Sequence, residues 1–263
     1  MPDHSSFRSS ALARAPLLLP APRRQWRAPD SVLGRLCAGT DPAGQLHPVF
    51  AGRQAFNGPV YAMLRLRLEP RLCLDCREGW YFNALNTAER LEMEGRYWRC
   101  SIPVRRSLDG AGRTAAIGIS TVVAWPEGRG WKALAAPLRA KAMPHRAGLL
   151  HVVPSGMFAP PYSVVANVRR ELREELGLEL APRQLRLTGV AVHALNQRPE
   201  ICTLLLLRRR PAVQLNEEFA RRVAEAPLRP GLALGDLRGF FAPGAAALVL
   251  AARMLGAAAA EEL

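Results

Sequence analysis

The chain has 263 residues, and its hydrophobic content of 49% provides for a buried core in one large domain or two modest ones. Its formal net charge of +14 favours phosphate-rich ligands, nucleic acid or an anionic surface as partners. The basic residues are spread along a chain rich in Arg, Ala, Pro and Leu, without a dense Lys/Arg tract interleaved with aromatic residues. The composition therefore argues against a dedicated nucleic-acid-binding domain.

Residues 1–30 are expected to form a flexible basic tail. They contain five arginines, and prolines surround the short apolar run at 17–19, which is too short for the core of a signal peptide. The odd number of cysteines, five, and the absence of a secretory leader argue against a disulfide scaffold and for a reducing interior. No stretch has the composition of a transmembrane helix, so a soluble cytoplasmic protein is expected.

Residues 31–110 are predicted to form a small α+β region whose role the sequence does not assign. The segment 63–68, MLRLRL, alternates apolar and basic residues, which predicts a half-buried strand. A capping box at 86–89 predicts the start of a helix, and 98–104 is expected to be another strand. Turn residues at 107–112 mark the best domain boundary, so a second domain is expected at 112–258.

Two features of this region each have two interpretations. Cys73 and Cys76 form a C-x-x-C pair, but no second pair follows at zinc-finger spacing, which favours buried thiols over a metal or redox site. The aromatic residues 80–82 are suited to stacking on a base or to packing in the core, and core packing is favoured.

The second domain shows alternating strand and helix patterns, which indicate an α/β or α+β fold. Strands are expected at 117–125, 131–138, 149–153, 185–195 and 201–207, and helices at 216–225 and 243–255. One further helix is predicted between Ser163, a suitable N-cap, and Gly177, a suitable C-terminal cap. An apolar stripe at helical spacing supports it, formed by Val165, Val168, Leu172 and Leu176.

Three glutamates lie beside this stripe. Glu171, Glu174 and Glu175 stand at i, i+3 and i+4, so their carboxylates crowd one patch of the helix surface. A hard cation such as Mg²⁺, which prefers oxygen ligands, would remove the repulsion. The alternative is a solvated charged face on which Arg170 and Arg173 offset the acids, and spacing alone does not separate the two.

The string REUxEExGU, with U a bulky aliphatic residue, is present at Arg170 to Leu178, and Gly156 stands at the upstream distance required by G-x5-E-x7-REUxEExGU. Eight fixed positions match, and the ninth, the first glutamate of the pattern, is Tyr162. The segment thus resembles the Nudix box of the Nudix hydrolases. The resemblance implies an α/β/α sandwich with a mixed sheet for the second domain.

The resemblance also implies a chemistry. Nudix enzymes hydrolyse a diphosphate linkage in a nucleoside diphosphate derivative with Mg²⁺ or Mn²⁺ bound at the box helix. It implies that Glu174 and Glu175 are the leading metal ligands and that Glu171 is a ligand or the base that orients the water. Arg170 would hold Glu171, the alternative being an ordinary i,i+4 pair with Glu174. Gly156 would let its carbonyl approach the metal.

Outside the box the candidates have weaker support. Glu200 opens a strand where these enzymes often place an extra acidic ligand or base, and a strand-edge charge is the alternative. Arg139, Lys141 and Arg146 precede the box and are candidates to bind substrate phosphates, or else form a solvated basic loop. His151 and His193 lie in apolar strands, where core histidines are favoured over catalytic ones.

The function predicted from these features is metal-dependent hydrolysis of a nucleotide-like small molecule. The alternative is a non-catalytic nucleotide-sensing or regulatory protein, because Tyr162 supplies no charge at neutral pH. The intact glutamates favour the first, and Tyr162 and the net charge favour the second. A nucleic-acid partner and a homo-oligomer are compatible with the sequence, although no motif points to either.

Overall fold

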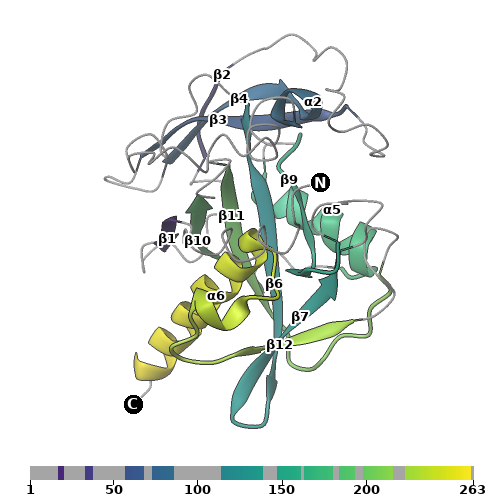
Figure 1. The fold of residues 1–263 in the computed structure, drawn as a ribbon, viewed down its shortest axis with the longest axis vertical. Helices are drawn as coiled ribbons and strands as arrows, with labels where there is room; N and C mark the ends of the chain where they lie inside the picture. Colours follow the sequence, from purple (N-terminus) through teal and green to yellow (C-terminus); the bar gives the residue numbers. More distant parts are fainter. Residues whose placement is uncertain are drawn as a thin grey trace, which may run out of the picture.

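The computed structural model describes residues 17–20, 33–37, 57–67, 73–85, 114–138, 147–160, 163–179, 184–192, 198–215 and 223–261. These residues form two sheets and the helices packed on them (Figure 1). The larger sheet has eight strands. In spatial order they are β1 (Leu17–Pro20), β10 (Leu185–Val192), β11 (Pro199–Leu206), β6 (Gly118–Glu127), β7 (Gly130–Pro137) and β12 (Ala224–Leu228), with β8 (Leu150–Val152) on β7 and β9 (Ser155–Met157) on β6.

The larger sheet is mixed. Strands β11 and β6 run parallel, whereas β6 is antiparallel to both β7 and β9. Successive side chains of a strand point to opposite faces, so β6 contributes Ile119 and Val123 to one core cluster and Val122 and Ala124 to another. Each face of the sheet therefore presents an apolar surface that a helix can cover.

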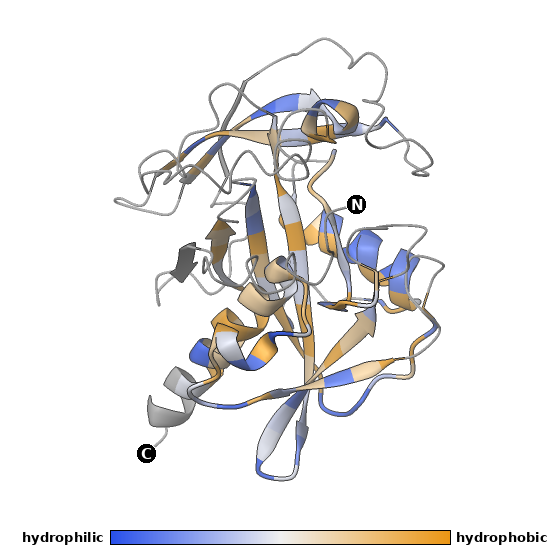
Figure 2. Ribbon diagram, viewed as in Figure 1, coloured by the Kyte–Doolittle hydropathy of each residue, from blue (hydrophilic) through white to orange (hydrophobic). Residues whose placement is uncertain are grey.

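Helices cover both faces. Helix α5 (Val164–Leu176) packs Val168 and Leu172 against the cluster that contains Ile119. Helix α6 (Ala242–Glu261), rich in small apolar residues, packs its buried residues 245–252 on the opposite face. Figure 2 shows α6 and the inner strands as mainly hydrophobic, while the outer side of α5 is hydrophilic. The expected α/β/α sandwich with a mixed sheet, within an α+β protein, is confirmed.

The smaller sheet joins the same core. Its strands are β2 (Leu33–Cys37), β4 (Cys73–Trp80), β3 (Pro59–Arg67) and β5 (Ala115–Ala116), and the short helix α2 (Tyr81–Ala84) follows β4. Tyr61 of β3 donates its backbone N–H to the carbonyl of Phe158 at 2.9 Å, and the two rings lie 5.1 Å apart between centroids. The N-terminal sheet thus contacts the segment that follows β9 directly.

Some expectations for the N-terminal half have a structural outcome, and others fall on residues that the structure does not describe. Cys76 is a buried free thiol, as expected, and the side chain of Cys73 lies outside the described part. Tyr81 packs against the small cluster of Val60, Ala84 and Ala116, which supports core packing for this aromatic residue. The predicted helix start at 86–89, the strand at 98–104 and the boundary at 107–112 lie outside the described residues. Within those residues, no helix combines the length and apolar character that a membrane crossing requires.

Two predictions differ from the structure. Residues 17–20, expected in the flexible tail, form β1 and pair with 189–192 of β10, because the apolar run meets an open sheet edge. The end of the predicted helix 216–225 is wrong, since Ala224–Leu228 is strand β12 paired with β7. Residues 226 and 228 are buried and 225 and 227 are exposed, so pairing imposes an alternation that a short alanine-containing segment does not reveal.

Helix α5 ends in a left-handed glycine cap. Gly177 has φ 65° and ψ 22°. Its N–H donates to the carbonyl of Arg173 at 3.1 Å, and the N–H of Leu178 donates to the carbonyl of Leu172. No atom of another described residue outside its chain neighbours lies within 4 Å of a Cβ added there, so the substitution is opposed by backbone strain. We expect Gly177→Ala to lower the free energy of unfolding by about 1 kcal/mol in urea.

Gly235→Ala is the matched control for this cap. Gly235 also has open space around a new Cβ, and its φ lies outside the left-handed range. Its substitution should change the free energy of unfolding by less than about 0.5 kcal/mol. Equal losses in the two variants would contradict a left-handed cap at Gly177.

Candidate functional site

The site is built on α5 and β9, two elements that local chemistry holds together. Ser163 is the N-cap of α5, and its Oγ accepts the N–H of Ala166 at 3.2 Å. The apolar stripe of α5 packs on the sheet, and β9 pairs with the beginning of β6 through Gly156 and Ile119. The glutamates beside the stripe are thereby brought to β9.

Glu171 lies against the backbone of Gly156. A Cβ built on Gly156 would stand 2.5 Å from Cδ of Glu171, which is closer than real Cβ contacts allow. The Glu171 side chain is 14% exposed, and its Oε1 accepts a hydrogen bond from Nη2 of Arg170 at 2.9 Å. Only glycine at position 156 leaves this carboxylate where it is.

The other two glutamates differ in environment. Glu175 is 2% exposed, and its Oε2 accepts the backbone N–H of Ser155 at 3.0 Å. Glu174 is exposed and forms no hydrogen bond or ion pair with another described residue. One carboxylate is thus held by β9, one lies over β9, and the third is turned toward solvent.

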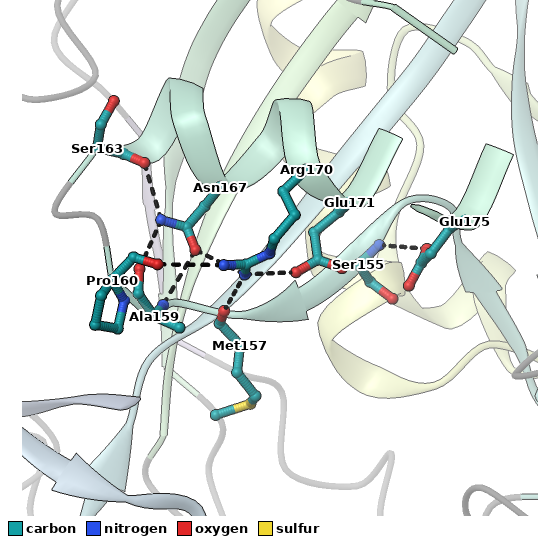
Figure 3. A network of polar contacts seen from close by, with 9 residues as sticks. All are labelled: Ser155, Met157, Ala159, Pro160, Ser163, Asn167, Arg170, Glu171 and Glu175. Carbon is teal, nitrogen blue, oxygen red and sulfur yellow. Dashed lines mark hydrogen bonds and ion pairs between the residues drawn. The ribbon is translucent and has the colours of Figure 1, made fainter. Parts of the chain in front are cut away.

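Arg170 joins the helix to the loop before it (Figure 3). Besides Glu171, its Nη2 donates to Oδ1 of Asn167 at 2.9 Å and its Nη1 donates to the carbonyl of Pro160 at 3.3 Å. Its acidic partner is therefore its immediate neighbour Glu171 and not Glu174. Arg173, on the next turn, pairs instead with Glu179, and their hydrogen bond raises the pKa of Arg173 and lowers that of Glu179.

The donor set fits a hard divalent cation, although the acids are not drawn together. Among the described residues, no three His, Cys, Asp or Glu side chains are grouped as metal ligands. Glu171 faces Arg170, Glu175 faces the Ser155 amide and Glu174 faces out. All three nevertheless offer carboxylate oxygens on one helix, the ligand type that Mg²⁺ and Mn²⁺ prefer. Because Gly156 has no side chain, the Glu171 carboxylate can lie directly against β9.

Glu200 lies on the other face of the sheet. It pairs with Gly118 across β11 and β6, while Gly156 pairs with Ile119, the neighbour of Gly118 whose side chain points to the opposite face. Its carboxylate lies over Gly118, where a Cβ would stand 2.6 Å from Cδ of Glu200, and it accepts a hydrogen bond from Oγ of Ser120. Burial, and secondarily the charge of Glu200, raise the pKa of the nearby Cys202 thiol.

The structure also shows residues that the sequence did not single out. Asn167, Ser120 and Gly118 each contact a candidate acid or its arginine partner. Asn167 carried a usable signal, because a polar residue of low helix propensity on the buried face of a helix requires partners. The sequence carries no such signal for Ser120 and Gly118, because their contacts with Glu200 depend on the register of β6 and β11.

Of the remaining predicted residues, His151 alone lies in the described part of the chain. Arg139, Lys141, Arg146, Tyr162 and His193 lie outside the described residues. His151 is buried on β8, and its ring meets that of Phe241 edge to face at 5.2 Å between centroids. This packing is that of a core histidine.

Comparison with known proteins finds similarity only among solved structures. No protein-family model and no curated protein sequence matches the chain. A MutT/nudix family protein from Enterococcus faecalis is 17% identical with a TM-score of 0.39, and the match covers 56% of each chain. An Ap4A hydrolase from C. elegans, solved as a binary complex, is 16% identical with a TM-score of 0.39, over 54% of this chain and 98% of that one. The NUDIX domain of Shewanella oneidensis NrtR, complexed with ADP ribose, is 14% identical with a TM-score of 0.39, over 61% of this chain and 96% of that one.

Proposed function

We propose that this protein hydrolyses a diphosphate linkage in a nucleoside diphosphate derivative, with Mg²⁺ or Mn²⁺ bound at α5 and β9. The observation that carries the proposal is the position of the Glu171 carboxylate in the space that a side chain at Gly156 would fill. A helix glutamate packed so closely on a glycine of the neighbouring strand places its carboxylate oxygens against the backbone of that strand. This donor set suits a hard cation bound to phosphate.

In this proposal each residue of the box has one role. Glu174 and Glu175 are the leading ligands, Glu171 is a ligand or the base that orients the attacking water, and the Gly156 carbonyl completes the set. Arg170 holds Glu171 through the 2.9 Å hydrogen bond. When bound, the cation polarises a phosphoryl oxygen and lowers the pKa of a bound water.

Residues outside the box complete the proposal. Glu200 is left out of the proposed site, because its carboxylate accepts a hydrogen bond from Ser120 on the face of the sheet opposite to α5 and Gly156. Arg139, Lys141 and Arg146 are proposed to bind the substrate phosphates, because guanidinium and ammonium groups match phosphate oxygens in charge and donor geometry.

The experiment that tests this function is a panel of nucleoside diphosphate derivatives incubated with Mg²⁺, with Mn²⁺, or with EDTA. We expect release of phosphate or nucleotide from at least one compound with metal and none with EDTA. The same turnover in EDTA would contradict metal dependence. Binding of nucleotide without turnover under either metal would overturn the hydrolase.

That last outcome would favour a nucleotide-sensing protein, the second candidate. Its supporting observation is the contact between the N-terminal sheet and the segment after β9, where Tyr61 binds the Phe158 carbonyl and stacks obliquely on its ring. A ligand that shifts β9 would therefore act on β3 of the smaller sheet. Nucleotide-dependent protection of β3 amides in hydrogen exchange, without turnover, is the result that this candidate predicts.

A further inference from the structure

A buried amide side chain of α5, that of Asn167, binds the backbone on either side of the loop that leads from β9 into the helix. Asn167 is 0% exposed. Its Oδ1 accepts the N–H of Ala159 at 3.1 Å, and its Nδ2 donates to the carbonyls of Ala159 at 2.8 Å and Ser163 at 3.0 Å (Figure 3). Because both backbone groups of Ala159 are bound, this residue is fixed in orientation as well as in position.

The same amide oxygen reaches toward the site. Oδ1 of Asn167 also accepts Nη2 of Arg170 at 2.9 Å, and Nη2 donates to Glu171 Oε1 at the same distance. Nη1 of Arg170 donates to the Pro160 carbonyl at 3.3 Å. A continuous set of hydrogen bonds therefore runs from the loop through Asn167 and Arg170 to the carboxylate over Gly156.

The amide of Asn167 is satisfied in one orientation only. Among the described residues, two N–H donors face Oδ1 and two carbonyl oxygens face Nδ2, so exchanging the oxygen and nitrogen would leave these four contacts mismatched. Asparagine has a lower helix propensity than the apolar residues Ala, Leu and Met, which would otherwise suit the buried face of α5. The Asn167 side chain forms hydrogen bonds both with the backbone of Ala159 and Ser163 and with Arg170, which indicates a positioning role.

We propose that Asn167 is a positioning residue that sets Arg170 and, through it, the direction of the Glu171 carboxylate. The proposal rests on the hydrolase function proposed above. It also gives the loop an anchor that does not depend on an acid at position 162, where the sequence has Tyr162. Buried hydrogen-bond partners of this kind tune metal sites and active sites without touching substrate.

A double-mutant cycle on Asn167→Ala and Arg170→Ala tests this role. With the substrate identified in the panel, each single variant should lower kcat about 10- to 100-fold, with KM changed less than about threefold. If Asn167 acts through Arg170, the double variant should fall within about threefold of Arg170→Ala. Losses that multiply in the double variant would overturn the proposal.

Ser163→Ala is the control for a merely structural effect. It removes the N-cap bond of α5 and leaves all contacts of Arg170 in place. We expect it to lower the urea midpoint measurably, through loss of the cap, while keeping kcat within about twofold. A loss of kcat in Ser163→Ala equal to that in Asn167→Ala would reduce Asn167 to a stabilising residue.

Mn²⁺ binding separates failure of this role from failure of the proposed function. If wild type hydrolyses substrate but the cycle is multiplicative, the role of Asn167 alone is refuted. If wild type neither binds Mn²⁺ nor hydrolyses any compound of the panel, the hydrolase is refuted and the positioning role of Asn167 with it. If wild type binds Mn²⁺, a rise of about tenfold in Kd in Asn167→Ala that Arg170→Ala reproduces supports the coupling independently of turnover.

Discussion

Glu174→Gln is expected to lower kcat at least about 100-fold, because loss of a metal ligand should cost no less than loss of the groups that orient it. The free energy of unfolding should stay within about 0.5 kcal/mol of wild type, since Glu174 is exposed and forms no hydrogen bond with a described residue. Steady-state hydrolysis of the best compound in the panel and urea unfolding measure the two quantities.

Glu179→Gln is the matched control for Glu174. Glu179 is an exposed acid just beyond the end of α5, paired with Arg173. Its replacement removes the same charge from the same region and should leave kcat within about twofold of wild type. Equal losses in the two variants would show that α5 contributes general surface charge and not a defined ligand.

Gly156→Ala is expected to lower kcat about 10- to 100-fold while leaving the protein folded. The three atoms nearest to the new Cβ all belong to the carboxylate of Glu171, the end of a flexible side chain, and the φ of Gly156 lies outside the left-handed range. The carboxylate should therefore rotate away, and the free energy of unfolding should fall by less than about 1 kcal/mol. Activity and stability separate only if the position of Glu171 matters for the reaction.

A second substitution sharpens this test. Glu171→Asp shortens the side chain by one methylene, so in combination with Gly156→Ala it makes room for the new methyl group. The double variant should recover part of the kcat lost in Gly156→Ala. Gly130→Ala, at a glycine where no described residue beyond the chain neighbours lies within 4 Å of a new Cβ, should behave as wild type. A double variant that is no better than Gly156→Ala, with Gly130→Ala impaired as well, would contradict the proposed contact.

The parts of the fold that were predictable from sequence are those decided by local chemistry. The caps of α5 illustrate this, because a serine hydroxyl before the helix and a glycine after it satisfy orphan backbone groups within one turn. Strand β12 was not predictable, because its sequence has no clear strand pattern and it becomes a strand through pairing with β7. Strand β1 likewise depends on the free edge of β10, which only the folded sheet provides.

The candidate site divides in the same way. The spacing of Glu171, Glu174 and Glu175 places them on one helix surface from sequence alone. Which of them is buried, held or exposed depends on where β9 runs, and β9 is positioned by pairing with β6. The face occupied by Glu200 depends on the register of two strands that are 80 residues apart at the Ser120–Glu200 contact. The hydrogen bond between Arg170 and Asn167 could not be predicted from sequence, because it depends on how the loop before α5 packs against the helix.

The most direct measurement of the central claim is a Mn²⁺ titration followed by electron paramagnetic resonance, on wild type and on a variant with Glu171, Glu174 and Glu175 all replaced by glutamine. We expect saturable binding in wild type that is lost in the triple variant and retained in Glu179→Gln. Wild type without saturable Mn²⁺ binding, or a triple variant that binds as tightly as wild type, would contradict a metal site on α5.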